Sequence, residues 1–137
     1  MTIDHSYYDQ TLLAEAKAIG QLTEKLDYKV MDKIVELLLT VKPRKARVFT
    51  AGCGTSGTAA RRIAHTLSCI EVPSAYLSPA DAPHGAMGLI QEGDVVVLIA
   101  KGGNTPEILN YVKCCKEKGA TIIAVTHNAA SKLAQAA

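Results

Sequence analysis

The chain has 137 residues, of which 48% are apolar and 20% are charged, and its formal net charge is +2. This length and this balance are typical of a single soluble domain with an ordinary hydrophobic core. The basic residues are spread along the chain, and the aromatic residues are one Phe, five Tyr and no Trp. We therefore expect no nucleic-acid stacking surface, and no apolar run approaches the ~20 residues of a membrane span.

Two helices are predicted ahead of the first strand. Apolar residues recur at helical spacing between residues 8 and 26, and a second apolar helix face follows before Lys42-Pro43-Arg44 ends it. We interpret residues 1–43 as an N-terminal helical segment. Because a single sheet does not require two such helices, we expect the first to pack partly against another copy of the chain.

Residues 44–137 are predicted to form an α/β domain with a doubly wound parallel sheet. Continuously apolar strands that alternate with helices indicate a parallel sheet covered on both faces. The predicted strands are residues 47–51, 74–77, 95–100 and 121–125, and the predicted helices are 56–69, 105–118 and a last one from about 130. The fourth strand would be an open edge, which a fifth strand missing from this sequence or a partner would cover.

The turn after the first predicted strand is the most informative part of the chain. Gly52, Gly54 and Gly57 lie among hydroxyl side chains directly before a helix, where free N–H groups favour an anion such as a phosphate. The three glycines fit GxGxxG, but a dinucleotide site also needs an acid at the end of strand two, and Asp81 falls past a proline. No GxxxxGK[ST] run occurs, which excludes a nucleotide P-loop.

A second glycine-rich turn, residues 101–105, follows the third predicted strand and also opens a helix. Ligands of doubly wound sheets bind beyond the carboxyl ends of the strands, at the point where the winding reverses. We therefore predict that the two turns converge on one anion site.

The runs AGCGTSG, SPADAPHGAMGLIQEGDVVVLIAKGGNTPEI and TIIAVTHN resemble the SIS (sugar isomerase) domain family. The resemblance extends from about residue 27 to the end and is greatest to arabinose 5-phosphate isomerases and their relatives. It implies a five-stranded sheet with flavodoxin-like winding, phosphosugar ligands, no obligatory cofactor, and homo-oligomers, dimeric or tetrameric, whose active sites lie at subunit interfaces.

The resemblance carries over residue by residue, with departures. Ser56 occupies the place of a phosphate-binding serine. Thr55 stands where arabinose 5-phosphate isomerases have lysine, and the run Gly54-Thr55-Ser56 is instead similar to the isomerase domain of glucosamine-6-phosphate synthase. The family's second loop reads SxSGExxE or SxSGxTxE, so Ala100 and Gly102 replace two hydroxyls. The predicted binding residues are Gly52, Gly54, Thr55, Ser56, Lys101, Gly103, Asn104 and Thr105.

Two residues are candidates for catalysis. Glu107 is suited to move a proton between adjacent carbons through an enediol, although a glutamate there also stabilises a helix dipole. His84 matches the family's HG motif and could assist in proton transfer, or it is an ordinary exposed loop histidine. Lys101 could replace the lost hydroxyls by its charge, or it points into solvent.

The remaining features set the class of protein. The four cysteines lack CxxC spacing, so we expect reduced, half-buried thiols and no metal site, with Cys53 either reactive in its turn or a small residue that fits. The first ten residues do not resemble a secretion signal, which favours the cytoplasm.

The leading hypothesis is a phosphosugar aldose–ketose isomerase; the alternative is a non-catalytic, regulatory SIS module that binds a sugar phosphate.

Overall fold

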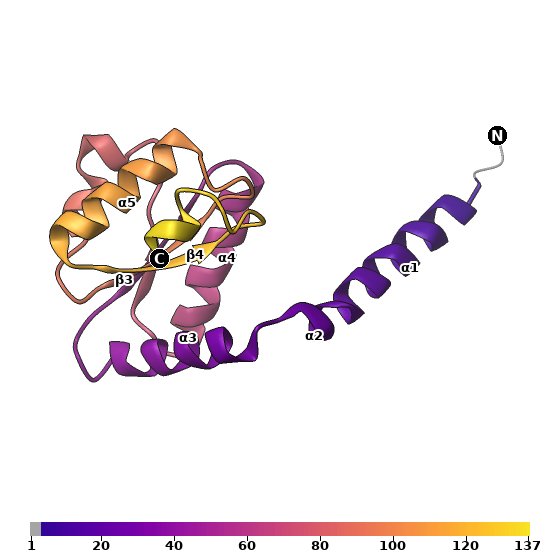
Figure 1. The fold of residues 1–137 in the computed structure, drawn as a ribbon, viewed down its shortest axis with the longest axis horizontal. Coiled ribbons are helices and arrows are strands. Elements are labelled where there is room, and N and C mark those ends of the chain that lie inside the picture. The colour runs from indigo at the N-terminus through magenta and orange to yellow at the C-terminus, as the bar shows by residue number, and fades with distance from the viewer. Residues whose placement is uncertain (1–3) are drawn as a thin grey trace. The chain divides into compact units, whose positions relative to one another are not determined.

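The computed structural model describes residues 4–137, and Figure 1 traces their elements. The boundary between two compact units falls between Val35 and Glu36, inside helix α3 (Tyr28–Val41). The first unit also contains α1 (Ser6–Gly20) and α2 (Leu22–Lys25), and the second contains the sheet.

The first unit differs from the single helix predicted over residues 8–26. Helix α1 ends at Gly20, and the chain turns at Gln21 before the single turn of α2. Leu26 is extended, and the carboxylate of Asp27 then accepts hydrogen bonds from the first amides of α3, at Lys29 (3.0 Å) and Val30 (3.3 Å). Asp27 therefore acts as the N-cap of α3, and the predicted helix is interrupted earlier, at Gln21 between α1 and α2.

The second unit is a four-stranded, all-parallel sheet with the strand order β2-β1-β3-β4. Its strands are β1 (Val48–Gly52), β2 (Ser74–Tyr76), β3 (Val95–Ile99) and β4 (Thr121–Val125). Helix α4 (Thr55–Cys69) follows β1, and α5 (Pro106–Lys118) follows β3. This arrangement confirms the predicted doubly wound α/β fold.

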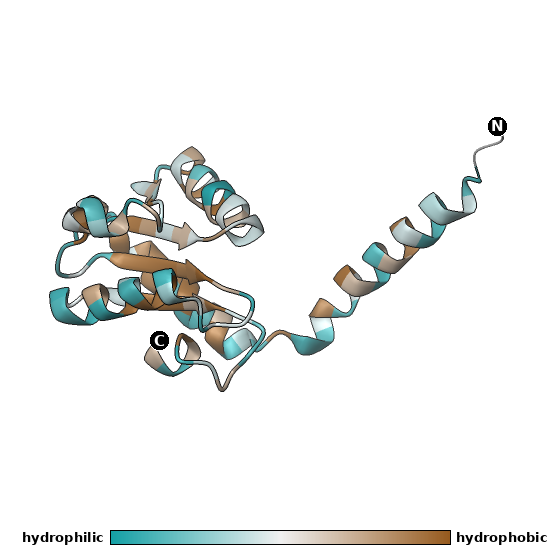
Figure 2. Ribbon diagram, turned by 90° about the horizontal axis from the view of Figure 1, so that it is seen from above, coloured by the Kyte–Doolittle hydropathy of each residue, from teal (hydrophilic) through white to brown (hydrophobic). Residues whose placement is uncertain are grey.

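Alternate residues of β1 face the two helical layers. The hydroxyl of Thr50 donates to the carbonyl of Ala60 in α4 (2.8 Å), whereas Phe49 and Ala51 belong to the core cluster that contains Tyr111 of α5. Successive side chains of a strand point to opposite faces, so α4 and α5 cover opposite sides of the sheet. Figure 2 shows the apolar strands between helices with mixed surfaces.

The end of the chain departs from the prediction of a helix from about residue 130. The structure has turns there and only a short 3₁₀ helix, η3 (Ala134–Ala136). The side chain of Asn128 accepts a hydrogen bond from the amide of Ala130 (3.0 Å), and Ser131 Oγ accepts one from the amide of Ala134 (3.2 Å). These local bonds compete with a regular helix, which is why the helix prediction is wrong.

The GD pair ahead of β3 has a structural role at the amino ends of the strands. Asp94 is buried, and its carboxylate accepts hydrogen bonds from the amide of Arg47 (2.8 Å), the amide of Gln91 (2.9 Å) and the guanidinium of Arg47 (3.0 Å). This end of the sheet is opposite the strand ends that lead into the two glycine-rich turns. Asp94 therefore stabilises the amino end of the sheet, which lies away from the predicted site.

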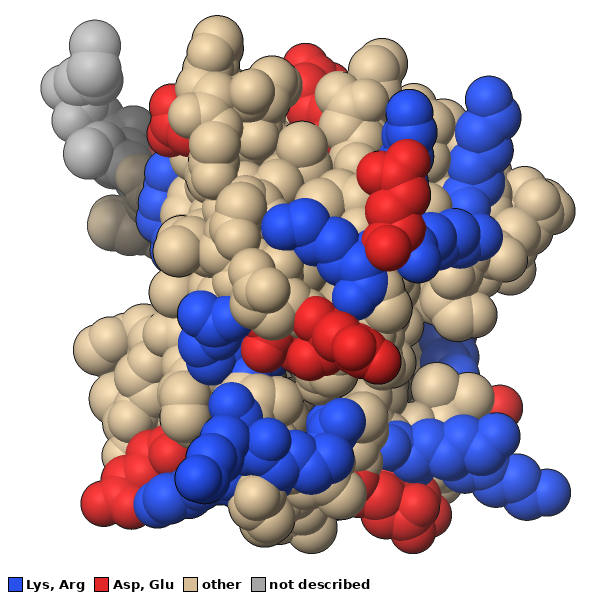
Figure 3. Space-filling model, turned by 90° about the vertical axis from the view of Figure 1, so that its left-hand side faces the viewer, with Lys and Arg blue, Asp and Glu red and all other residues tan. Residues whose placement is uncertain are grey.

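The charged residues of the chain are intermixed. On the face drawn in Figure 3, Lys and Arg side chains lie among Asp and Glu side chains and form no single basic patch there. None of the helices within residues 4–137 combines the length and the apolar character needed to cross a membrane.

Candidate functional site

The first glycine-rich turn joins β1 to α4 by an unusually close approach of two backbone segments. A Cβ atom added to Gly57 would lie 2.6 Å from the carbonyl oxygen of Gly52, and one added to Gly52 would lie 2.6 Å from the backbone of Ser56. Gly54, between them, has φ +55°, a conformation that side chains disfavour. The spacing of the three glycines is therefore required by the geometry of the turn.

This turn leaves hydrogen-bond donors free. Among the hydrogen bonds of residues 4–137, none uses the amide N–H of Gly54, Thr55 or Ser56, or the hydroxyls of the last two. The first amides of a helix have no intrahelical acceptor, and the helix dipole places positive charge beside them. The start of α4 is thus prepared for an anion, as predicted from the sequence.

A cleft of about 330 Å³ opens beside this turn. Its lining comes from the turn, from α4, from the end of β2 with the loop that follows, and from the first turn of α5. The lining residues are Gly52, Cys53, Gly54, Gly57, Arg61, Tyr76, Ser78, Pro79, Ala80 and Glu107. The structure therefore brings Gly52, Gly54 and Glu107 of the predicted site together.

Arg61 and Tyr76 are among the lining residues that were not predicted as site residues. The guanidinium of Arg61 lies over the ring of Tyr76, 4.1 Å from its centroid. The hydroxyl of Tyr76 donates a hydrogen bond to the carbonyl of Gly52 (3.1 Å), so the same side chain supports the turn. The sequence does not reveal this contact, because the alignment of α4 with β2 cannot be read from spacing.

Glu107 and Cys53 both line the cleft. Glu107 is the second residue of α5, after Pro106, where a carboxylate also stabilises the helix dipole. Burial, and secondarily the negative charge of Glu107, raises the pKa of the Cys53 thiol above its ordinary value of 9.0. Cys53 is exposed, but a raised pKa keeps it protonated near neutral pH, so it is not an activated nucleophile.

The second glycine-rich turn does not line this cleft. Its backbone is bonded to the end of the chain instead: Lys101 accepts from the amide of His127 (3.0 Å), and Gly103 accepts from the amide of Leu133 (3.1 Å). The side-chain oxygen of Asn104 accepts from the amide of Lys132 (3.0 Å). The second turn therefore contributes to the cleft through Glu107, which follows it, whereas Lys101, Gly103, Asn104 and Thr105 are outside the lining.

The other predicted residues lie near the cleft or apart from it. Thr55 and Ser56 stand between Gly54 and Gly57 at the start of α4, although their atoms are not part of the lining. His84 is exposed at the end of η1 (Ala82–His84) and does not line the cleft of its own chain. Tyr111, which is buried, donates from its hydroxyl to the carbonyl of Ser78 (3.2 Å) and so anchors the loop that forms one wall.

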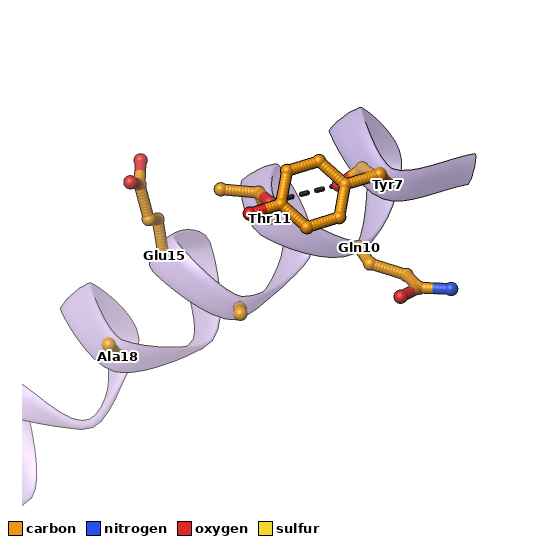
Figure 4. Close-up of a pocket in the computed structure, with 6 residues that line it drawn as sticks. Tyr7, Gln10, Thr11, Glu15 and Ala18 are labelled. Atoms are coloured by element: carbon orange, nitrogen blue, oxygen red, sulfur yellow. Dashed lines mark hydrogen bonds between the residues drawn. The ribbon is translucent and has the colours of Figure 1, made fainter. Parts of the chain in front are cut away.

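A second hollow lies on α1 and is unlike the cleft. Figure 4 shows that its side chains come from this one helix, with the ring of Tyr7 over Thr11. The dashed line marks the bond from the hydroxyl of Thr11 to the carbonyl of Tyr7 (2.9 Å). A helix surface without a second wall cannot enclose a small ligand, so we place the site at the strand ends.

The cysteines are all free: Cys53 and Cys69 are exposed, whereas Cys114 and Cys115 are buried. Half-burial was expected for them, and α5 instead encloses its adjacent pair. Within residues 4–137, no three His, Cys, Asp or Glu side chains are grouped so that they could hold a metal ion.

Known proteins share this fold and much of this sequence. A model of the SIS domain matches residues 42–137. The chain is 37% identical over 126 residues to the arabinose 5-phosphate isomerase KpsF of Escherichia coli O6:H1, and 38% identical over 128 residues to the arabinose 5-phosphate isomerase KdsD of Pseudomonas aeruginosa. These matches cover 92% and 93% of this chain but 38% of each relative, so the chain spans well under half of their length.

Solved structures of similar proteins have the same fold. A Listeria monocytogenes structure described as a candidate sugar-phosphate isomerase superimposes with a TM-score of 0.92 at 41% identity, over 100% of this chain and 72% of that one. An Escherichia coli CFT073 protein solved in complex with arabinose 5-phosphate superimposes with a TM-score of 0.85 at 26% identity, over 98% of this chain and 71% of that one. Since the family model matches well over half of the sequence, the chain belongs to the SIS domain family.

Proposed function

We propose that the chain binds a sugar phosphate in the cleft at the start of α4 and takes part in its aldose–ketose isomerisation. The observation that carries this proposal is one cleft lined by both Glu107 and Gly54, whose free amide adjoins the free donors of Thr55 and Ser56. The phosphate would accept from the amides of Gly54 and Ser56 and from the hydroxyls of Thr55 and Ser56. Relatives named arabinose 5-phosphate isomerases, and a structural neighbour solved with arabinose 5-phosphate, support an aldopentose phosphate as the ligand.

Glu107 is the proposed acid–base residue. Its carboxylate would remove the proton from C2 of the aldose while O1 gains a proton, which gives an enediol. It would then return the first proton to C1 while O2 loses its proton, which forms the ketose. No electron acceptor is needed, because oxidation at C2 and reduction at C1 balance within the sugar. His84 would assist in proton transfer from a neighbouring copy, since it does not line the cleft of its own chain.

A coupled assay over a panel of aldose and ketose phosphates tests this role. We expect Glu107→Gln to lower kcat by roughly 100-fold or more with little change in KM, because removal of a general base affects the chemical step. Glu117→Gln is the matched control, since Glu117 is an exposed acid of the same helix whose one ion pair among residues 4–137 is with Lys113. Equal turnover by the parent and Glu107→Gln would remove Glu107 from the mechanism.

A regulatory module that binds a sugar phosphate without turnover is the second candidate. The second turn is hydrogen-bonded to the end of the chain through Lys101, Gly103 and Asn104. This bonding favours the regulatory module, because a turn held in this way offers fewer groups to a substrate. The two hydroxyls that family members carry there are replaced by Ala100 and Gly102. Thermal stabilisation by sugar phosphates together with no detectable turnover would select this candidate.

The proposed assembly is a cytoplasmic homo-oligomer. Within the first unit α1 has no buried residue, and Leu12, Leu13 and Ile19 are 64%, 70% and 67% exposed. An amphipathic helix gains stability when its apolar face is covered, and a second copy of the chain would provide that cover. The four free thiols are typical of a reducing compartment.

A further inference from the structure

Arg61 stands out among the residues that the proposed mechanism does not use. Arg61 lines the cleft, and among the hydrogen bonds and ion pairs of the described residues none involves its guanidinium. An arginine carries five N–H donors in a rigid planar fork, which suits two oxygens of one phosphate. A cation with unused donors in a cleft that also holds free amides is an anion-binding group.

Tyr76 holds this guanidinium in place. The 4.1 Å distance from the guanidinium carbon to the ring centroid is a close cation–π contact, and it restricts an otherwise flexible side chain. Arg61 is six residues after Thr55, which places its Cα about 9 Å along the helix axis, and helical side chains lean toward the N-terminus. The Arg61 side chain is therefore directed back toward the first turn.

The same tyrosine connects Arg61 to the turn itself. Its hydroxyl donates to the carbonyl of Gly52 (3.1 Å), and a Cβ atom on Gly57 would lie 3.3 Å from that hydroxyl. The ring of Tyr76 thus sets the position of the cation, and its hydroxyl sets the position of the turn that carries the free amides. One residue of β2 aligns both sets of donors.

We infer that Arg61 is a substrate-binding residue that holds the phosphate group of the ligand from the side opposite the amides of the first turn. This inference rests on the proposed function, because it requires a phosphate ester in the cleft. Arg61 of α4 would then supply the positive charge that compensates for the missing hydroxyls of the second turn. From the sequence, Lys101 was the candidate for this role. Lys101 is exposed and is not part of the lining.

The test measures binding of arabinose 5-phosphate and of inorganic phosphate to the full chain by calorimetry, together with KM and kcat where turnover occurs. We expect Arg61→Gln to weaken both ligands and to raise KM by roughly 10- to 100-fold, as for a lost hydrogen bond to a charged group, with kcat changed by less than threefold. Arg62→Gln is the matched control, because Arg62 is the adjacent exposed arginine of α4 outside the cleft. Arabinose without phosphate should bind no worse to Arg61→Gln than to the parent.

Two further variants separate binding from folding. Tyr76→Phe removes only the hydroxyl that supports the first turn, so it should weaken phosphate binding less than Tyr76→Leu, which also removes the stacking surface of Arg61 and should weaken phosphate binding tenfold or more. Far-ultraviolet circular dichroism of each variant confirms that it is folded. Arg61→Gln and Arg62→Gln with the same phosphate affinity as the parent would overturn the inference while leaving the proposed function intact. A parent chain that binds no sugar phosphate would overturn both.

Discussion

Replacement of Gly57 by Ala should disturb both the stability of the turn and its affinity for phosphate. The added Cβ would lie 2.6 Å from the carbonyl oxygen of Gly52 and 3.3 Å from both its carbon and the hydroxyl of Tyr76. The two nearest atoms belong to the backbone, so the turn itself must move. Gly57 is helical, and alanine gains about 1 kcal/mol of helix propensity there, whereas overpacking against backbone atoms this close costs about 2–3 kcal/mol, the upper part of the usual range.

The net expectation for Gly57→Ala is a loss of about 1–2 kcal/mol of unfolding free energy and a melting temperature lower by roughly 3–10 °C. Urea denaturation and thermal melts measure this loss, and phosphate affinity should fall roughly tenfold because the amides of the first turn are displaced. Gly102→Ala is the matched control: nothing lies within 4 Å of its Cβ position. A Gly57→Ala protein as stable as the parent, with the same phosphate affinity, would refute this account of the turn.

Two further predictions concern stability. Asp94→Ala should lower the unfolding free energy by about 2–4 kcal/mol, because three buried or half-buried donors lose their acceptor; a change below about 0.5 kcal/mol in urea denaturation would contradict the role of Asp94. Burial raises the pKa of the Cys115 thiol from 9.0 to about 12 and raises that of the Tyr111 hydroxyl. Both groups are neutral when folded, so their contribution is complete below pH 9 and is lost as the pH rises toward 12. Stability should fall by up to about 1.4 kcal/mol per pH unit above about pH 9 because of Cys115, and by up to as much again above pH 10 because of Tyr111, whose ordinary pKa is 10.0. Cys115→Ala should show a shallower fall, and a flat profile would show that these groups are not shielded.

The parts of the fold that the sequence predicted well depend on local patterns. Strand β4 matches residues 121–125, and β1 is displaced by one residue from 47–51, because continuous apolar runs mark buried parallel strands. The glycine turn was also predictable, since Gly54 and its neighbours must satisfy local steric limits.

The parts that were missed depend on contacts between distant segments. The stacking of Arg61 on Tyr76 arises from the packing of α4 against β2, which no spacing rule reveals. The second turn resembles an anion site locally, but the amides of Lys132 and Leu133 bond to it. A local motif therefore indicates which groups a turn offers, and tertiary contacts decide which of them stay free for a ligand.

The claim on which the account depends is that the start of α4 receives the phosphate. The most direct test is a nuclear magnetic resonance titration of the ¹⁵N-labelled chain with arabinose 5-phosphate. We expect the largest amide shifts at Gly54, Thr55 and Ser56, with a smaller response at Glu107. Saturable shifts centred on residues 101–105 instead, or no saturable shift at any amide of the first turn, would contradict the account.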